Sequence, residues 1–321
     1  MTEPRCLLCY DELEADSGDI HARCARRLYG KGPIPQLDVS LDQVQTLAEQ
    51  AVRARITVPG AQAKLSLGLA GGGSTRAPRR LTLVDAPAGY ILKPPSPDFP
   101  FLPELEDLSM HLTRLAGIPC VPHGLVRLAS GEFAYLTRRI DRQNGTKLHM
   151  EDMGQLGGKP TEAKYRGSHE QVARLLQRFS AQPGLDLIRL YEQVHVAFLL
   201  GNSDLHLKNL SLLKDPQRSW LLSPAYDMVA TRLVLETDPD ELALTLNGKR
   251  SRLDHGDFLA AMATSGLEPK AAHNLQRRVA HALPGWHTMI DRSFLPAELR
   301  LRFHALITER SARLGIGGQT E

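Results

Sequence analysis

The chain has 321 residues, of which 42% are hydrophobic, so it can bury the core of one large two-lobed domain or of two ordinary domains. Lysine and arginine total 39, aspartate and glutamate total 36, and the net charge of +3 is too balanced for a dedicated nucleic-acid binder. No run of about 18 apolar residues occurs, and the N-terminus lacks the basic and then apolar pattern of a signal peptide. We therefore expect a cytoplasmic protein with no membrane contact.

Three of the four cysteines lie within the first 24 residues, a grouping that favours metal binding over disulfide cross-linking. Cys6-x₂-Cys9 and His21-x₂-Cys24 supply four ligands in two close pairs, which predicts a tetrahedral, structural Zn²⁺ site. The alternative is incidental free thiols beside a surface histidine. The glycine- and proline-containing stretch at 30–35 indicates an exit linker, so we assign residues 1–35 to a zinc module and its linker.

Short alternating apolar runs follow, at 65–69, 81–83, 90–92, 125–128 and 133–136, and they predict the strands of an antiparallel sheet. Between the third and fourth runs, leucines at three- and four-residue spacing predict one helix over 104–116, which Gly117 and Pro119 end. We assign residues 36–145 to this mixed sheet region.

Beyond residue 145 the apolar spacing becomes helical. Val172, Leu175, Leu176 and Phe179 form one stripe, and the segment 187–198 carries another. Residues 146–321 are therefore predicted to be helical, and the whole chain to be an α+β protein with a two-lobe plan.

The segment GNSDLHLKN at 201–209 concentrates polar groups between two apolar runs. Asp204 and Asn209, five positions apart and next to Lys208, match the needs of phosphoryl transfer: a carboxylate for the attacking hydroxyl, an amide oxygen for a metal ion and a cation for phosphate charge. Asp227 lies 18 residues beyond Asn209, where a second metal-binding carboxylate is expected. The alternative for each aspartate is a helix or turn cap.

Two features upstream fit the same chemistry. Lys93 ends a predicted strand and Glu106 lies on the next helix. In phosphoryl-transfer sites, such a lysine binds the α- and β-phosphates and is held by a helix carboxylate. The alternative is a solvated lysine at a strand end. A turn with one glycine precedes the strand at residue 65, and its backbone amides are expected to cradle phosphates; it consists of Val58, Pro59, Gly60, Ala61 and Gln62.

The strings ITVPGAQAKLSL, YILKPPSPDFPFLPELED, YLTRRIDR, MEDM, GNSDLHLKNLSLL and LSPAYDMVA occur in the order found in HipA-like serine/threonine kinases. The chain resembles this family over about residues 50–230, and especially its short HipT branch, which lacks an extra N-terminal subdomain. The resemblance implies a bilobal protein-kinase-like fold, with a mixed antiparallel-sheet N-lobe and an all-helical C-lobe after the zinc-type module.

The resemblance also implies roles for individual residues. It makes Asp204 the catalytic base, Asn209 and Asp227 the Mg²⁺ ligands, and Lys93 the lysine that binds ATP phosphates. His206 and Lys208 would support the catalytic loop, and residues 58–62 would form the phosphate loop. The hinge that holds adenine and ribose would consist of Arg138, Arg139, Ile140 and Asp141.

In the family, a serine just before the phosphate loop is autophosphorylated, which switches the kinase off. The matching residue here is Thr57, and Pro59 stands where the HipT pattern has a second serine. Autophosphorylation at Thr57 is thus expected from the resemblance, and an ordinary β-branched strand residue is the alternative.

The resemblance further implies the toxin of a toxin–antitoxin system, with a protein substrate such as an aminoacyl-tRNA synthetase and an antitoxin as partner. DNA would be met only through that antitoxin. Two alternatives stay open: a HipA-like kinase with a non-toxin substrate, and a catalytically silent module that binds ATP or acts through zinc.

Overall fold

Alternating apolar residues build an antiparallel sheet in the computed structural model, which describes residues 4–14, 18–54, 64–71, 79–84, 88–143, 146–215 and 219–316. The strands are β1 (Leu65–Gly71), β2 (Arg79–Leu83), β3 (Tyr90–Lys93), β4 (His123–Arg127) and β5 (Phe133–Arg138). They form one five-stranded sheet in the order β2-β1-β3-β5-β4, and every neighbouring pair is antiparallel. The predicted strands are therefore confirmed, each within two residues of the expected position.

The chain divides into two compact units. The first comprises Met1–Asp107, Val121–Asn144 and Arg292–Phe294, and the second comprises Leu108–Cys120, Gly145–Asp291 and Leu295–Glu321. Helix α3 (Leu102–Leu115) confirms the predicted helix and begins two residues before its expected start. Among the described residues, no helix combines the length and the apolar character that a membrane crossing needs.

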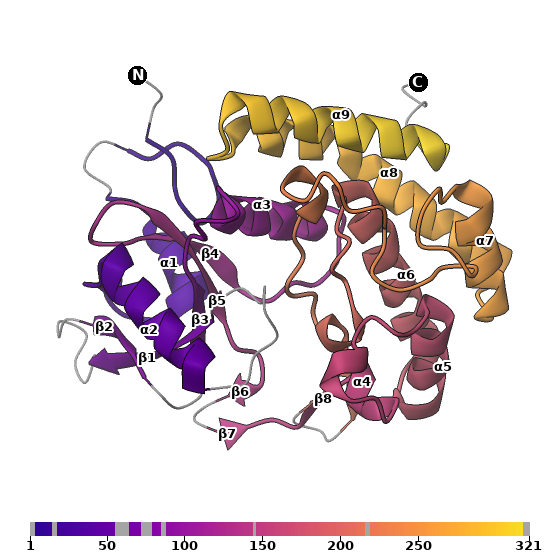
Figure 1. Ribbon diagram of the computed structural model, residues 1–321, viewed down its shortest axis with the longest axis horizontal. Helices are drawn as coiled ribbons and strands as arrows, with labels where there is room; N and C mark the ends of the chain where they lie inside the picture. The colour runs from indigo at the N-terminus through magenta and orange to yellow at the C-terminus, as the bar shows by residue number, and fades with distance from the viewer. Residues whose placement is uncertain are drawn as a thin grey trace. The chain divides into compact units, whose positions relative to one another are not determined.

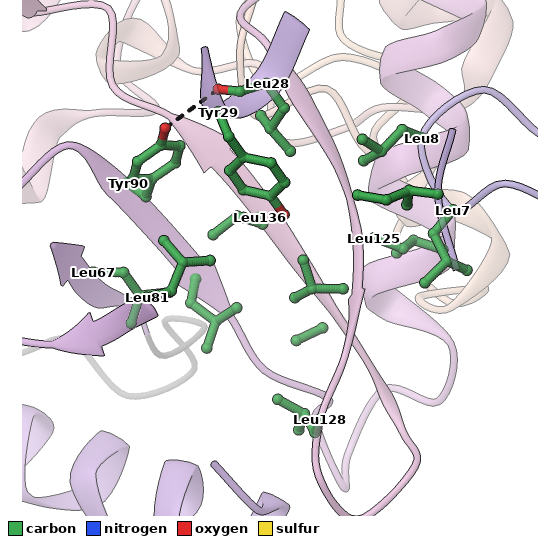
Figure 2. Close-up of a cluster of buried hydrophobic side chains, with 14 of the residues drawn as sticks. Leu7, Leu8, Leu28, Tyr29, Leu67, Leu81, Tyr90, Leu125, Leu128 and Leu136 are labelled. Carbon is green, nitrogen blue, oxygen red and sulfur yellow. Dashed lines mark hydrogen bonds between the residues drawn. The ribbon is translucent and has the colours of Figure 1, made fainter. Parts of the chain in front are cut away.

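The core of the first unit joins the N-terminal segment to the sheet. Helices α1 (Ala22–Tyr29) and α2 (Leu41–Ala54) lie against the strands (Figure 1). Leu7 and Leu8 are buried beside Leu125 of β4, and the Tyr90 hydroxyl of β3 donates to the Leu28 carbonyl at 3.3 Å (Figure 2). The cysteine-bearing segment is thus part of the same hydrophobic cluster as β1 to β5.

The second unit is built around α6 (Pro183–Leu200), which is buried along almost its whole length and packs against α5 (His169–Phe179) and α9 (Ala297–Arg313). Its apolar run begins after Pro183, a residue suited to the first turn of a helix. The other helical elements are α4 (Met153–Leu156), η1 (Thr161–Ala163), η2 (Leu207–Asn209), η3 (Thr231–Leu233), α7 (His255–Thr264) and α8 (Pro269–Arg292). The short strand β6 (Arg142–Gln143) of the first unit pairs with β7 (Thr146–Lys147).

The expectation of an all-helical second half is wrong in one respect. Three strands, β8 (Met150–Asp152), β9 (Ser211–Lys214) and β10 (Trp220–Leu222), form an antiparallel sheet in the order β10-β9-β8. The apolar run that follows residue 209 is too short for a stable helix, and pairing on both sides satisfies its backbone. This sheet fixes the residues just after the GNSDLHLKN segment.

Candidate functional site

The GNSDLHLKN segment begins where α6 ends. Gly201 caps the helix with a left-handed backbone, φ 75°. A β-carbon at this position would lie 2.8 Å from the Arg232 Cβ and 2.8 Å from the Leu306 Cδ2, so only glycine fits. The chain is thereby turned out of the helix into the loop at 202–209.

Within this loop, the backbone of Asp204 is held while its carboxylate stays accessible. The Asp204 N–H donates to the Oδ1 of Asn202 at 2.9 Å, and the Asn209 Nδ2 donates to the Asp204 carbonyl at 2.9 Å. Asn202 and Asn209 are buried, whereas the Asp204 side chain is 40% exposed. A rigid backbone with an exposed carboxylate suits a group that must accept a proton from a substrate.

Tyr165 contacts the same carboxylate. Its hydroxyl donates to the Asp204 Oδ1 at 2.5 Å. Partial burial, and then the Asp204 hydrogen bond, raise the pKa of Tyr165 well above its usual range, so the phenol stays protonated and keeps donating. No motif in the sequence marks Tyr165, because it precedes Asp204 by 39 residues and lies in an irregular segment.

His206 is buried next to this pair. Its ring lies edge-on to the Tyr165 ring, with centroids 5.1 Å apart, and its Nε2 is 3.9 Å from the Asp204 Oδ1. Burial lowers the pKa of His206, and the carboxylates of Asp204 and Asp227 oppose that shift only partly. The imidazole is therefore neutral at neutral pH, and both carboxylates act electrostatically in the same region of the unit.

Lys208 anchors the loop to the neighbouring sheet. Its Nζ donates to the Oδ2 of Asp152 at 3.0 Å, and its carbonyl accepts from the Tyr226 hydroxyl at 2.9 Å. Asp152 ends β8 and also caps α4, where its side chain and that of Gln155 form a reciprocal capping box. The MEDM string thus supplies a structural partner for the loop.

Asp227 adopts a backbone conformation that L-residues avoid, φ 55°. Such a conformation costs about 1–2 kcal/mol for a residue other than glycine and is often found at functional sites. It follows Tyr226, whose hydroxyl is fixed by Lys208 and by the Ser211 Oγ at 2.5 Å. The strained Asp227 is therefore held by a tethered neighbour.

In the first unit, Lys93 and Glu106 form a buried ion pair from β3 and α3, with side chains 4% and 1% exposed. The Lys93 Nζ also lies 5.5 Å from the centroid of the Tyr135 ring, across the β3–β5 register. The predicted lysine and helix carboxylate are thus brought together. The pairing leaves the Lys93 ammonium at a defined position, as binding of phosphate requires.

The segment at 138–141 follows β5. Arg138 pairs with Tyr90 in the sheet. Arg139 contacts both carboxylate oxygens of Asp141, at 2.9 and 2.7 Å, and Arg142 donates to the same carboxylate at 2.5 Å. Burial would raise the pKa of Asp141, but the two guanidinium groups outweigh it and hold the pKa below its usual range. Thr57 and the loop at 58–62 lie outside the described residues.

The four predicted zinc ligands are brought together as well. One donor atom from each of Cys6, Cys9, His21 and Cys24 lies within 4.8 Å of the others, and all four residues belong to the first unit. The predicted residues that the structure describes thus divide between the two units: the zinc ligands, the Lys93 pair and residues 138–141 belong to the first unit, and the Asp204 loop and Asp227 belong to the second.

A family model described as the HipA-like C-terminal domain matches residues 56–286. The putative kinase Y4mE of Sinorhizobium fredii is 31% identical over 212 residues, which are 63% of this chain and 48% of that protein. The putative kinase Y4dM of the same organism is 29% identical over 250 residues, 73% of this chain and 59% of that protein, and a putative kinase of Haemophilus influenzae is 30% identical over 162 residues, 46% of each chain. The chain spans about half the length of the curated relatives it matches.

Two solved structures resemble the fold. A chain in the complex of HipA, HipB and operator DNA from the toxin–antitoxin system of Shewanella oneidensis MR-1 superposes with a TM-score of 0.66 at 19% identity, covering 89% of this chain and 74% of that one. The proinflammatory kinase CtkA of Helicobacter pylori superposes with a TM-score of 0.54 at 16% identity, covering 74% and 88%. At these identities the likeness establishes the fold.

Proposed function

Because the chain belongs to the family of the HipA-like C-terminal domain, we propose that it transfers the γ-phosphoryl group of ATP, with Mg²⁺, to a serine or threonine hydroxyl of a protein. The observation that carries the proposal is the loop at 202–209, which holds the Asp204 backbone and leaves its carboxylate accessible. The putative-kinase names of the curated relatives support it.

The side chains of the second unit fit a magnesium ion, which prefers carboxylate and amide oxygens. Asn209 uses its Nδ2 to donate to the Asp204 carbonyl, which leaves its Oδ1 as the atom suited to a cation. Asp227 acts on His206 together with Asp204, so its carboxylate belongs to the same region. Asn209 and Asp227 would hold the ion, which supplies charge neutralisation on the phosphate oxygens when bound.

The chain's own groups then have separate tasks. Asp204 accepts a hydrogen bond from the acceptor hydroxyl and receives its proton as the oxygen attacks. Lys208, tied to Asp152, keeps the loop in place, while the Lys93 ammonium, held by Glu106, binds phosphate oxygens.

The proposal extends to partners by analogy with the fold neighbours. The neighbour from Shewanella oneidensis was solved with HipB and operator DNA, so we propose an antitoxin protein as partner of this chain, with DNA reached through it. The proposed acceptor is a protein of translation, such as an aminoacyl-tRNA synthetase. Thr57 is proposed as a site of autophosphorylation.

A phosphorylation assay with labelled ATP and Mg²⁺ tests the proposal on the full chain. Wild type is compared with Asp204→Asn and with Asp291→Asn, which makes the same chemical change elsewhere in the second unit, at a carboxylate that accepts from His304. Loss of a catalytic base costs about 10²–10⁴ in rate, so transfer to cell-extract proteins or to the chain itself should fall by at least about 100-fold only in Asp204→Asn.

Mass spectrometry of residues 50–70 then shows whether Thr57 carries phosphate. Equal transfer by wild type and Asp204→Asn would exclude Asp204 as the base. Binding of ATP without any transfer would favour the catalytically silent alternative.

A further inference from the structure

The N-terminal segment folds so that two separate turns present soft ligands to one point. Cys6 and Cys9 lie in a tight turn closed by a backbone bridge between Arg5 and Glu12, and the Tyr10 N–H donates to the Cys6 carbonyl at 2.9 Å. His21 and Cys24 come from the start of α1. Cys9 and His21 are 12 residues apart in the sequence, yet the Cys9 Sγ and the His21 Nδ1 are 3.4 Å apart in the structure.

These separations match a tetrahedral zinc site. Bond lengths of about 2.3 Å for Zn–S and about 2.0–2.1 Å for Zn–N place the ligand atoms of such a site about 3.5–3.8 Å apart. The Cys9 and Cys24 sulfurs lie 3.4 and 4.0 Å from the His21 Nδ1, and all four donor atoms lie within 4.8 Å of one another. All four cysteines of the chain are free thiols, so no disulfide competes for these sulfurs.

A second hydrogen bond orients the histidine for this role. The Nε2 of His21 lies 2.9 Å from the Glu12 carbonyl oxygen. Since a carbonyl oxygen only accepts hydrogen bonds, the Nε2 carries the ring proton and donates it. The lone pair is then on Nδ1, the atom that faces Cys9 and Cys24. Metal-bound histidines are typically held by such a bond from the other ring nitrogen to a carbonyl.

We propose that Cys6, Cys9, His21 and Cys24 bind one structural Zn²⁺ ion. Three thiolates and one imidazole complete a tetrahedral shell, so no position stays open for a substrate. The site is separate from the Asp204 loop and does not depend on the proposed kinase activity.

The metal would fasten the N-terminal segment to the sheet. Within the first ligand pair, the Leu7 N–H donates to the Asp19 carbonyl at 3.0 Å, and the Leu125 N–H of β4 donates to the Leu7 carbonyl at 3.1 Å. At the last residue of α1, the buried Arg79 of β2 donates to the Tyr29 carbonyl at 2.7 Å. The segment is therefore bonded to the sheet both within the first ligand pair and beyond the second.

The same site reaches the predicted ATP-binding pair through Tyr10. This residue follows Cys9 directly, has a strained backbone at φ 63°, and donates from its hydroxyl to the Asp107 Oδ2 at 2.7 Å. Asp107 is fully buried and directly follows Glu106, the partner of Lys93. Zinc at Cys9 would thus hold α3 through Tyr10. An influence of the zinc on ATP binding rests on the proposed function, because it requires that Lys93 binds ATP.

Metal analysis of the full chain, purified under reducing conditions, tests the site. We expect about one zinc ion per chain in wild type, and a loss of affinity of at least about 100-fold in Cys24→Ser, since even the loss of an outer partner of a zinc ligand costs 10–100-fold. His21→Cys should retain zinc, because four thiolates also form a structural site. Cys120→Ser, at a thiol that contacts the Ile118 carbonyl at 3.3 Å in the second unit, is the matched control and should bind as wild type does.

If Cys24→Ser is insoluble, two measurements on wild type decide the question. Replacement of the metal by Co²⁺ should give the intense visible absorption of a tetrahedral thiolate site, and a chelator should speed the reaction of three thiols with Ellman's reagent. Three results would overturn the proposal. The wild type could bind no zinc after incubation with it, Cys24→Ser could bind zinc with the affinity of the wild type, or the purified protein could contain iron in place of zinc.

The Asp204→Asn variant separates this inference from the proposed function. It should keep its zinc whether or not the wild type transfers phosphate. Conversely, chelation should weaken ATP binding in wild type if Tyr10 transmits the effect to Glu106, and Tyr10→Phe should do so with zinc still bound. Unchanged ATP affinity in both would restrict the zinc to a role in stability.

Discussion

The Asp204 carboxylate is shared between a candidate catalytic role and a contact with its own chain. A base needs a free lone pair for the acceptor hydroxyl, and the Tyr165 hydroxyl already occupies one on Oδ1. The phenol donates to this carboxylate as an acceptor hydroxyl would. An incoming substrate therefore has to displace Tyr165 or use one of the remaining lone pairs on Oδ1 or Oδ2.

We predict that Tyr165→Phe raises kcat/KM for the protein acceptor by up to about 100-fold, because a hydrogen bond to a charged group contributes about 1.5–3 kcal/mol and that bond competes with the substrate. Initial rates with varied acceptor measure this. Tyr226→Phe removes a hydroxyl that binds the Lys208 carbonyl of the same loop, and it should produce no increase. A fall in kcat/KM for Tyr165→Phe would mean that the phenol positions the base.

At this scale the sequence predicts what lies within one short string. Asp204, His206, Lys208 and Asn209 share one loop, so their proximity follows from chain connectivity. The contacts from Tyr165 and Asp152 could not be predicted, since both depend on how distant segments pack. The contact of Asn202 could be predicted, because the side-chain oxygen of an asparagine can accept from the N–H two residues later, as in an Asx turn.

Among the elements, β3 and α3 meet at a buried charge pair. Two desolvated charges are stable together, but removal of one partner leaves the other uncompensated, at a cost of about 3–5 kcal/mol. Replacement of both by apolar groups of similar volume is often neutral.

We therefore predict that Lys93→Met and Glu106→Leu each lower the free energy of unfolding by about 3–5 kcal/mol, while the double variant recovers most of that loss and still fails to bind ATP. Denaturant unfolding followed by circular dichroism, together with nucleotide titration, measures both quantities. ATP binding by the double variant would exclude Lys93 as the phosphate ligand.

The period of the apolar residues predicts the elements well where one face is buried. The alternation in β1 and the leucine spacing in α3 both follow from that condition. The short strands β8 and β10 escaped prediction, because three residues carry too little periodicity and pairing partners far along the chain decide their conformation.

At the scale of the whole molecule, each unit has its own buried titratable groups. His169 and His195 are fully buried in the second unit, and burial lowers the pKa of each to about 4. Their unfolded pKa is about 6.5, so the second unit keeps this contribution to stability above pH 6.5 and loses it as the pH falls toward 4.

We predict a loss of about 2 kcal/mol per histidine between pH 7.5 and pH 5. Tryptophan fluorescence during urea unfolding reports on this unit, because both tryptophans, Trp220 and Trp286, lie in it. His195→Asn can still donate to the Tyr191 carbonyl, which the His195 Nδ1 contacts at 2.7 Å, and it should flatten the pH dependence by about half. A slope equal to that of wild type would show that other groups govern the acid transition.

The contact between Leu7 and β4 has a consequence for solubility. β4 is an outer strand of the five-stranded sheet, and an uncovered outer strand recruits other chains by adding strands. The Leu7 carbonyl occupies the Leu125 N–H, and Leu8 covers Gly124 so closely that a β-carbon there would lie 1.8 Å from its Cδ2. The N-terminal segment thus shields the sheet edge. If this segment detached from β4, the chain would self-associate before it unfolded.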